Sequence, residues 1–214
     1  MSANTFKYLR GNTQAKTPPF TQAIALSGDR AGSKGMFQFA GFAWIYDTKA
    51  ILVQGDVQSL KTPPEWRQLL RLVNLARRLR KPIILWNLPV VHIATEQRKT
   101  SLANTQAIQN TELALLKLPH PVISVFDENY DGVYPSPERI WNDGLVIVGS
   151  LDTQIAESGK IKIIQQPTEI TSAILDLLGQ AGTIPTSELI ANRRTSLYMF
   201  AKTEAEFSSK LPSR

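Results

Sequence analysis

The stretch TPPEWRQLLRLVNLARRLRKPIILW, residues 62–86, decides the fold. Thr62 suits the N-cap of a helix and Pro63 suits its first turn, so a helix is expected to begin here. Apolar residues then recur at helical spacing as far as Arg80, and Pro82 blocks the helix from continuing. The short apolar run after Pro82 predicts a buried strand. A helix that leads directly into a buried strand indicates an α/β protein.

The flanking segments extend this pattern in both directions. MFQFAGFAWI (36–45) and KAILVQG (49–55) have the aromatic and β-branched composition of strands, and YDT between them predicts a hairpin turn. After the central stretch, residues 100–118 predict a second helix and PVISVF (121–126) a second buried strand. A hairpin that leads into helix–strand pairs is typical of a ββα spiral.

The remainder predicts two more strands and two helices. LVIVGS (145–150) and KIKIIQQ (160–166) are strand-like. Residues 167–179 predict a helix closed by Gly179 in the position of a C-cap glycine. Residues 185–202 predict the last helix, with an N-cap at Thr186 or Ser187.

Length and composition favour one domain. With 214 residues, 43% of them hydrophobic, the chain can form a sizeable core. We expect an N-terminal arm at 1–20, a single domain at 21–202 and a flexible tail at 203–214. The absence of cysteine excludes disulfides and thiol catalysis. No signal peptide or membrane span is evident, which predicts a cytoplasmic protein or one from an organelle interior such as the plastid stroma.

The net charge of +6 suggests an anionic partner. Arg67, Arg71 and Arg78 share one face of the predicted helix, opposite its apolar residues. This face is open to two interpretations, a solvated surface or a basic stripe that contacts phosphates or an acidic protein. No recognisable nucleic-acid-binding motif accompanies it, so nucleic-acid binding is the weaker alternative.

Four blocks of the sequence resemble the α subunit of the carboxyltransferase component of acetyl-CoA carboxylase, a family with the crotonase-type fold. They are SGDRAG (27–32) with the hairpin that follows it, EWRQLLRLVNLARRLRKPIILW, ANTQAIQNTELALLKLPHPVISV, and TSELIANRRTSLYMF (186–200). The resemblance spans about residues 20–200 and implies a crotonase-like ββα spiral, truncated relative to the family. It also implies structural roles for two motifs, Gly28-Asp29-Arg30 and Asn192-Arg193-Arg194.

The departures from the family concern its chemistry. The family has a threonine-proline-glycine loop after the first buried strand and a run of glycines after the second, whose amides help to stabilise an enolate oxygen. Here no glycine occurs at 81–100, and Asp127, Glu128 and Asp131 follow the second strand. Carboxylates there would repel both an enolate and the phosphates of coenzyme A. The resemblance therefore implies a retained scaffold that has lost carboxyltransferase activity.

Other candidate residues have structural interpretations beside the functional ones. His120, between two prolines, is expected to be structural, while His92 near Glu96 could form a catalytic pair. Asp127, Glu128, Asp131 and Glu138 could serve acid–base chemistry or a divalent cation, or form a solvated loop. The histidines and carboxylates have no metal-ligand spacing, and no nucleotide-binding or hydrolase motif is present, so no cofactor or metal is expected.

The loop 127–142 is the predicted partner contact. It combines Tyr130, Tyr134 and Trp141 with Asp127, Glu128 and Asp131, a mixture typical of protein interfaces. The alternative is that its aromatic residues cover the core of this chain. The leading hypothesis is a catalytically degenerate carboxyltransferase-α-like protein that acts as a binding, assembly or regulatory module. Its partner would be a carboxylase subunit, a second copy or an unrelated complex. The alternative is an active acyl-CoA enzyme subunit.

Overall fold

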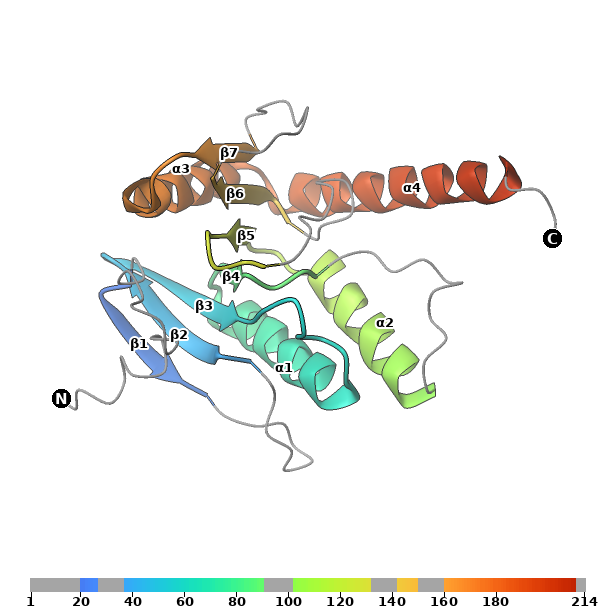
Figure 1. The fold of residues 1–214 in the computed structure, drawn as a ribbon, viewed down its shortest axis with the longest axis horizontal. Helices are drawn as coiled ribbons and strands as arrows, with labels where there is room; N and C mark the ends of the chain where they lie inside the picture. The colour runs from blue at the N-terminus through green and yellow to red at the C-terminus, as the bar shows by residue number, and fades with distance from the viewer. Residues whose placement is uncertain (1–19, 27–36, 91–101, 132–141, 150–159, 211–214) are drawn as a thin grey trace.

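The computed structural model describes residues 20–26, 37–90, 102–131, 142–149 and 160–210, except for the side chains of 200, 201 and 203–210. The described residues form an α/β structure with a seven-stranded sheet in the sequential order β1 to β7 (Figure 1). The α/β class and the expected order of hairpin, helix, strand, helix and strand are confirmed. The Gly28-Asp29-Arg30 motif lies outside the described residues.

The first three strands are antiparallel. They are β1 (Gln22–Ala25), β2 (Phe39–Ile45) and β3 (Thr48–Gln54), and β2 and β3 form the expected hairpin. Its two-residue turn has Tyr46 in the left-handed region at φ 50°. The strand β1 was not predicted from the sequence, and it begins two residues after Phe20. Phe20, expected at the end of an exposed arm, is buried against Trp86.

The helix α1 (Pro63–Leu79) has the predicted boundaries because both ends are capped. At its start, Glu65 Oε2 accepts hydrogen bonds from the Thr62 backbone N–H and from the Thr62 hydroxyl, each at 2.8 Å. At its end, Arg80 adopts a left-handed conformation with φ 54°. Of the predicted apolar face, Leu69, Leu72, Val73 and Ala76 are buried, but Leu79 is 44% exposed.

Four parallel strands continue the sheet from β3. They are β4 (Ile83–Trp86), β5 (Val122–Phe126), β6 (Gly144–Val148) and β7 (Ile161–Ile164), and each pairs with the strand before it. Between β4 and β5 lies α2 (Leu102–Leu116). The described residues of β4, β5 and β6 are all buried, as expected for parallel strands covered on both faces.

Two cores sandwich the sheet. On one side α1 and α2 pack against apolar residues of β3 and β4, and on the other α3 (Ile170–Thr183) packs against β5 and β6 (Figure 1). A short 3₁₀ turn, Pro167–Glu169, leads into α3. Gly144 in β6 makes close packing with α3 possible, because an added Cβ would lie 3.1 Å from Leu177 Cδ1.

The two C-terminal helices are longer than predicted. Gly179 does not close α3, which continues for one more turn because Ala181 is buried and favours the helix. The last helix, α4 (Thr186–Lys210), continues through most of the segment expected to be a flexible tail, and it projects beyond the sheet (Figure 1). None of the helices within the described ranges combines the length and the apolar character needed to cross a membrane.

Candidate functional site

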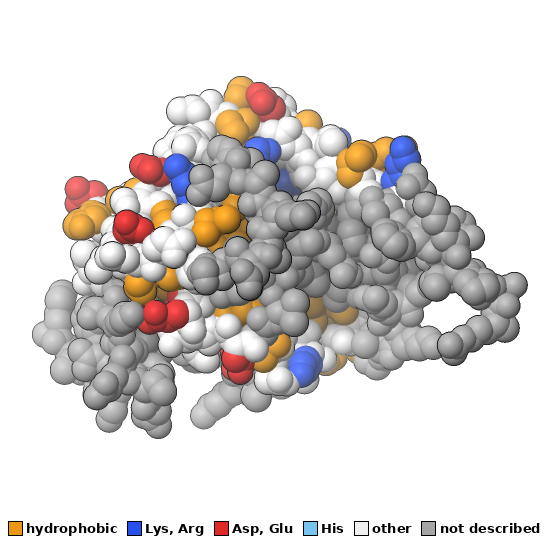
Figure 2. Space-filling model, turned by 45° about the horizontal axis from the view of Figure 1, so that its top comes forward, with side chains coloured by type: hydrophobic (Ala, Val, Ile, Leu, Met, Phe, Trp, Pro, Cys, Tyr) orange, Lys and Arg blue, Asp and Glu red, His pale blue; other side chains and the backbone are white. Residues whose placement is uncertain are grey.

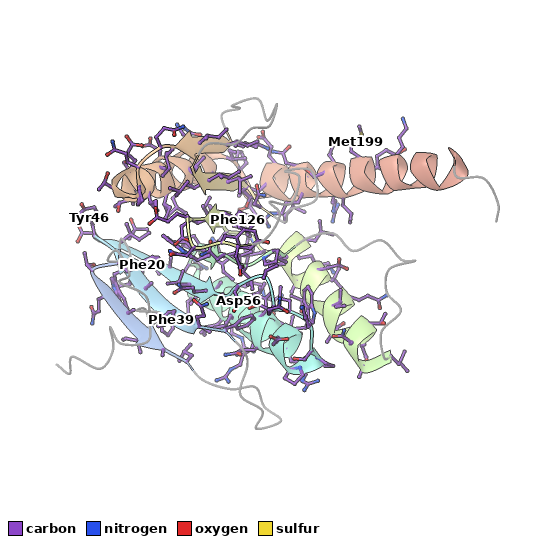
Figure 3. The ribbon with its side chains drawn as sticks, in the orientation of Figure 1. Phe20, Phe39, Tyr46, Asp56, Phe126 and Met199 are labelled. Carbon is purple, nitrogen blue, oxygen red and sulfur yellow. The ribbon has the colours of Figure 1, made fainter. Side chains whose placement is uncertain are left out.

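The candidate site lies where the carboxyl ends of β3, β4 and β5 meet. Parallel strands place their carboxyl ends at one edge of a sheet, where α/β proteins commonly bind ligands. Gly55 and Asp56 follow β3, Asn87 follows β4 and Asp127 follows β5. Figure 3 labels Asp56 and Phe126, which mark the ends of the outer two of these strands.

Asp127 is the centre of a buried hydrogen-bond network. Its Oδ1 accepts from Asn87 Nδ2 at 2.6 Å and from the Asn129 backbone N–H at 2.9 Å. Its Oδ2 accepts from Trp86 Nε1 at 2.9 Å and from Asn129 Nδ2 at 3.2 Å. A carboxylate has about four lone-pair positions. Because four N–H groups already donate to Asp127, its carboxylate is arranged to hold the two strand ends together.

Asn87 completes this network from the end of β4. Its Oδ1 accepts from the Asp127 backbone N–H at 2.9 Å, while its own backbone N–H donates to the Val125 carbonyl at 2.7 Å. Asn87 has φ 49°, a left-handed conformation that asparagine tolerates better than most residues. Asn87 and Asp127 therefore bind each other reciprocally across two strands.

The end of β3 is closed by a local turn. The Asp56 N–H donates to Ser59 Oγ at 3.0 Å, and Asp56 Oδ1 accepts from the Gln58 N–H at 2.8 Å and from the Ser59 hydroxyl at 3.1 Å. The Gly55 N–H donates to the Trp86 carbonyl at 2.9 Å. A Cβ at Gly55 would lie 2.6 Å from both Leu88 Cδ1 and Ser59 Oγ, so the turn has no space for a side chain.

Five of the described backbone amides at this edge donate to acceptors of the chain itself. The amides of Asn87, Asp127 and Asn129 donate to Val125, Asn87 and Asp127, respectively. The Tyr130 amide donates to the Asp127 carbonyl at 3.0 Å, and that of Val90 donates to the Leu88 carbonyl at 2.9 Å. Stabilising an enolate oxygen requires N–H donors that point into a free space. These five amides point instead at acceptors of the chain itself.

The predicted partner-contact loop is only partly exposed. Asp127 is buried in the network, and Tyr130 is 8% exposed with its ring packed on Phe126 at a centroid distance of 4.7 Å. These two residues pack within the chain, as the alternative of core cover describes, and the partner contact stays a prediction for the rest of the loop. Glu128 and Asp131 are exposed. Tyr134, Glu138 and Trp141 lie outside the described residues.

The predicted basic residues lie on α1. On α1, Arg71 and Arg78 are exposed and Arg67 is half-buried. Figure 2 shows the face that carries α3 and α4, where the described charged and hydrophobic side chains are interspersed. His92 and Glu96 are outside the described residues. Within the described ranges, no three His, Asp or Glu side chains form a group that could hold a metal ion.

Arg193, in the Asn192-Arg193-Arg194 motif, has a clear structural environment. Its guanidinium is buried and pairs with Asp143 through Nε at 2.9 Å and through a second, shorter contact. It also donates to the carbonyls of Leu115, Leu118 and His120. Arg193 thus connects α4 to the end of α2 and to the start of β6. Asn192 is half-buried and Arg194 is exposed.

His120 lies near this ion pair, with its backbone carbonyl accepting from Arg193 at 2.8 Å. Burial lowers the pKa of the His120 imidazole, and the positive charges of Arg80, Arg193 and Lys81 lower it further. These surroundings favour the neutral imidazole, in keeping with the expected structural role.

Sequence reasoning missed Asn87 and Asp143. The available signal for Asn87 was an asparagine directly after a buried strand, at the edge where ligands bind. Asp143 directly precedes β6, and its Oδ2 also accepts from the Val122 N–H at 2.8 Å. Neither residue belongs to a short motif, because its partners are 40 and 50 residues away along the chain.

No protein-family model and no curated protein sequence matches this chain. Among solved structures it is similar to transcarboxylase 12S, at 13% identity and a TM-score of 0.36, over 64% of this chain and 25% of that one. It is also similar to the β subunit of geranyl-CoA carboxylase from P. aeruginosa, at 10% identity and a TM-score of 0.38, over 80% and 31% of the two chains. An enoyl-CoA hydratase/carnithine racemase from Magnetospirillum magneticum is a third, at 14% identity and a TM-score of 0.34, over 84% and 77%. The chain thus spans about a quarter to a third of the two carboxylase-type chains, and likenesses this distant do not assign an activity to it.

Proposed function

We propose that this chain is a catalytically degenerate carboxyltransferase-α-like protein that acts through protein binding, in assembly or regulation. The closed network at the carboxyl ends of β4 and β5 is the observation that carries the proposal. An acyl-CoA enzyme of this layout needs backbone N–H donors at these strand ends for the thioester oxygen. In this chain two such N–H groups already have acceptors. The Asp127 N–H donates to Asn87 Oδ1, and the Asn129 N–H donates to Asp127 Oδ1.

The charge at this edge supports the same conclusion. An enolate oxygen placed beside Asp127 would approach a buried carboxylate, and two negative charges in a site of low dielectric repel each other strongly. Glu128 and Asp131, exposed on the same loop, would repel the phosphates of coenzyme A. A general base also needs a lone pair that faces the substrate, and the lone pairs of Asp127 are occupied by Trp86, Asn87 and Asn129.

The proposed protein-binding role no longer includes all the expected interface residues. The buried Asp127 and Tyr130 are withdrawn from the interface, while Glu128 and Asp131 are retained as exposed charges. The basic residues Arg67, Arg71 and Arg78 of α1 remain candidates for a second contact. The partner would be a carboxylase subunit, a second copy of the chain or an unrelated complex.

Titration of the purified chain with acetyl-CoA tests the proposal. We expect no calorimetric signal at micromolar ligand and no malonyl-CoA formation when a carboxyltransferase β subunit and a carboxyl donor are supplied. An active carboxyltransferase α subunit, assayed in parallel, controls for the competence of the β subunit. Micromolar affinity for acetyl-CoA, or malonyl-CoA above the background without this chain, would refute the proposed loss of activity and favour the alternative of an active acyl-CoA enzyme.

A further inference from the structure

A second surface lies at the opposite edge of the sheet, where β4 and β5 begin. Ile83 pairs with Val122 in parallel register, and the Ile83 N–H donates to the Pro121 carbonyl at 2.9 Å. Continued backwards along both strands, this register brings Lys81 and His120 side by side at the edge. The C-terminal ends of α1 and α2 lead into the same two strands, so their last residues gather here.

Positive charge is concentrated at this edge. We define the amino-edge surface as Arg77, Arg78, Leu79, Arg80, Lys81 and Lys117, of which all but the half-buried Lys81 are exposed. The positive charges of Arg80, Arg193 and Lys81 lower the pKa of His120, which places these charges around the imidazole. The buried carboxylate in this region, Asp143, is already paired with Arg193.

The amino-edge surface also presents apolar groups. Leu79 is 44% exposed between Arg78 and Arg80 in the sequence, and Pro82 and Pro121, which directly precede β4 and β5, are half-buried. Basic residues at helix ends interact favourably with the helix dipole, which accounts for cations at this edge. The dipole does not account for a leucine left exposed among them. The surface therefore offers a partner both positive charge and apolar contact.

We propose that the amino-edge surface binds an acidic segment of a partner protein that also carries apolar side chains. The inference rests on the proposed protein-binding role and names the chemistry of the partner. Carboxylates of such a segment would pair with Arg80, Lys81 and Lys117, while an apolar side chain would cover Leu79. The phosphate backbone of a nucleic acid would satisfy only the charges, so the exposed Leu79 favours protein over nucleic acid.

Fluorescence anisotropy on the full chain tests this proposal with defined probes. The first probe is a labelled peptide of Glu-Asp-Leu repeats. The second is its Gln-Asn-Leu counterpart, the third its Glu-Asp-Ser counterpart, and the fourth a single-stranded oligonucleotide of similar charge. We expect the chain to bind the Glu-Asp-Leu peptide most tightly, at least about tenfold more tightly than the uncharged peptide.

Substitutions then locate the binding surface. Arg80→Asn together with Lys81→Gln removes two charges, and asparagine tolerates the left-handed conformation at position 80. We expect this variant to weaken binding of the acidic peptide about tenfold, because it removes two of the charges that would pair with the carboxylates of the peptide. Leu79→Ser should weaken binding of the Glu-Asp-Leu peptide but not of the Glu-Asp-Ser peptide. Lys202→Gln, at an exposed position on α4, is the matched control and should leave affinity unchanged.

Three results would overturn the inference. They are the absence of acidic-peptide binding, tighter binding of the oligonucleotide than of the peptide, and affinity that does not respond to Arg80→Asn/Lys81→Gln. The acetyl-CoA titration keeps the two proposals separate. If the chain binds neither acetyl-CoA nor the acidic peptide, only the proposal for the amino-edge surface is refuted. If the chain binds acetyl-CoA, the proposed loss of activity is refuted, whether or not the peptide binds.

Discussion

Replacing Asp127 by alanine tests the hydrogen-bond network at the carboxyl ends of β4 and β5. The substitution removes the acceptor for four N–H groups. Two of them, Trp86 Nε1 and Asn87 Nδ2, belong to side chains that are at most 5% exposed. The other two belong to Asn129, which is exposed and can donate to water instead.

The magnitude follows from the two buried donors. Leaving a buried donor unsatisfied costs about 1–3 kcal/mol, so Asp127→Ala should lower the free energy of unfolding by about 2–6 kcal/mol. A domain of this kind is stable by about 5–15 kcal/mol, so the loss should be large in any assay. Asp127→Asn keeps one acceptor oxygen for Asn87 and leaves Trp86 facing an amide NH₂. It should therefore lower the stability by about half as much.

Urea unfolding followed by far-UV circular dichroism measures these differences. Asp131→Ala is the matched control, because it removes an exposed carboxylate from the same loop and should change the midpoint little. If Asp127→Ala were no more destabilising than Asp131→Ala, the network would not hold the strand ends, and the proposed loss of activity would lose its main support.

Three further predictions concern other parts of the fold. Gly41→Ala should disrupt the pairing of β1 with β2, because the added Cβ would lie 2.1 Å from the Ile24 carbonyl oxygen. Gly179→Ala should instead stabilise α3 by about 0.5–1 kcal/mol, because the added Cβ would meet no neighbouring atom within 4 Å, and thermal unfolding compares the two variants. Arg193→Ala should lower the free energy of unfolding, measured in urea, by about 3–5 kcal/mol, because it leaves the buried Asp143 carboxylate without its cationic partner. If Arg193→Ala lowered the stability as little as Arg194→Ala, the structural role of Arg193 would be contradicted. The pKa of His120 is lower in the folded state than its ordinary 6.5, so its contribution to stability is present above about pH 6.5 and is lost as the pH falls towards the folded pKa. His120→Gln should therefore reduce the drop in melting temperature between neutral and mildly acidic pH, and an unchanged drop would refute this explanation.

The central part of the fold was predictable from local signals. The α1 boundaries follow from Thr62 at the N-cap and Pro82 after the C-terminus, and the structure reproduces them. The buried strands β4 and β5 follow from short apolar runs that are each preceded by a proline. Each of these signals acts over a few residues, so it can be read without knowledge of tertiary contacts.

The errors arose where tertiary packing overrides the local signal. β1 has only one buried residue of four, so its composition does not identify it, and it is held by pairing with β2. Gly179 resembles a C-cap, but the burial of Ala181 on the α3 face extends the helix past it. The candidate site was only half predictable for the same reason. Its location follows from the order of the strands, whereas the reciprocal bonds of Asn87 and Asp127 join residues 40 positions apart.

The reciprocity of Asn87 and Asp127 also bears on what would be needed to expose a backbone amide at these strand ends. The Asp127 N–H donates to Asn87 Oδ1, and Asn87 Nδ2 donates back to the Asp127 carboxylate. Freeing that amide for a substrate oxygen by changing Asn87 alone would remove a donor from a buried carboxylate, and changing Asp127 alone would strand the donors of Asn87 and Trp86. Each single substitution is therefore costly, and a joint replacement of both side chains would still leave the buried Trp86 Nε1 without its acceptor. Insertion of glycines into the neighbouring loop would leave this pair in place. The hydrogen bonds that close these strand ends are thus the same ones that stabilise this part of the fold.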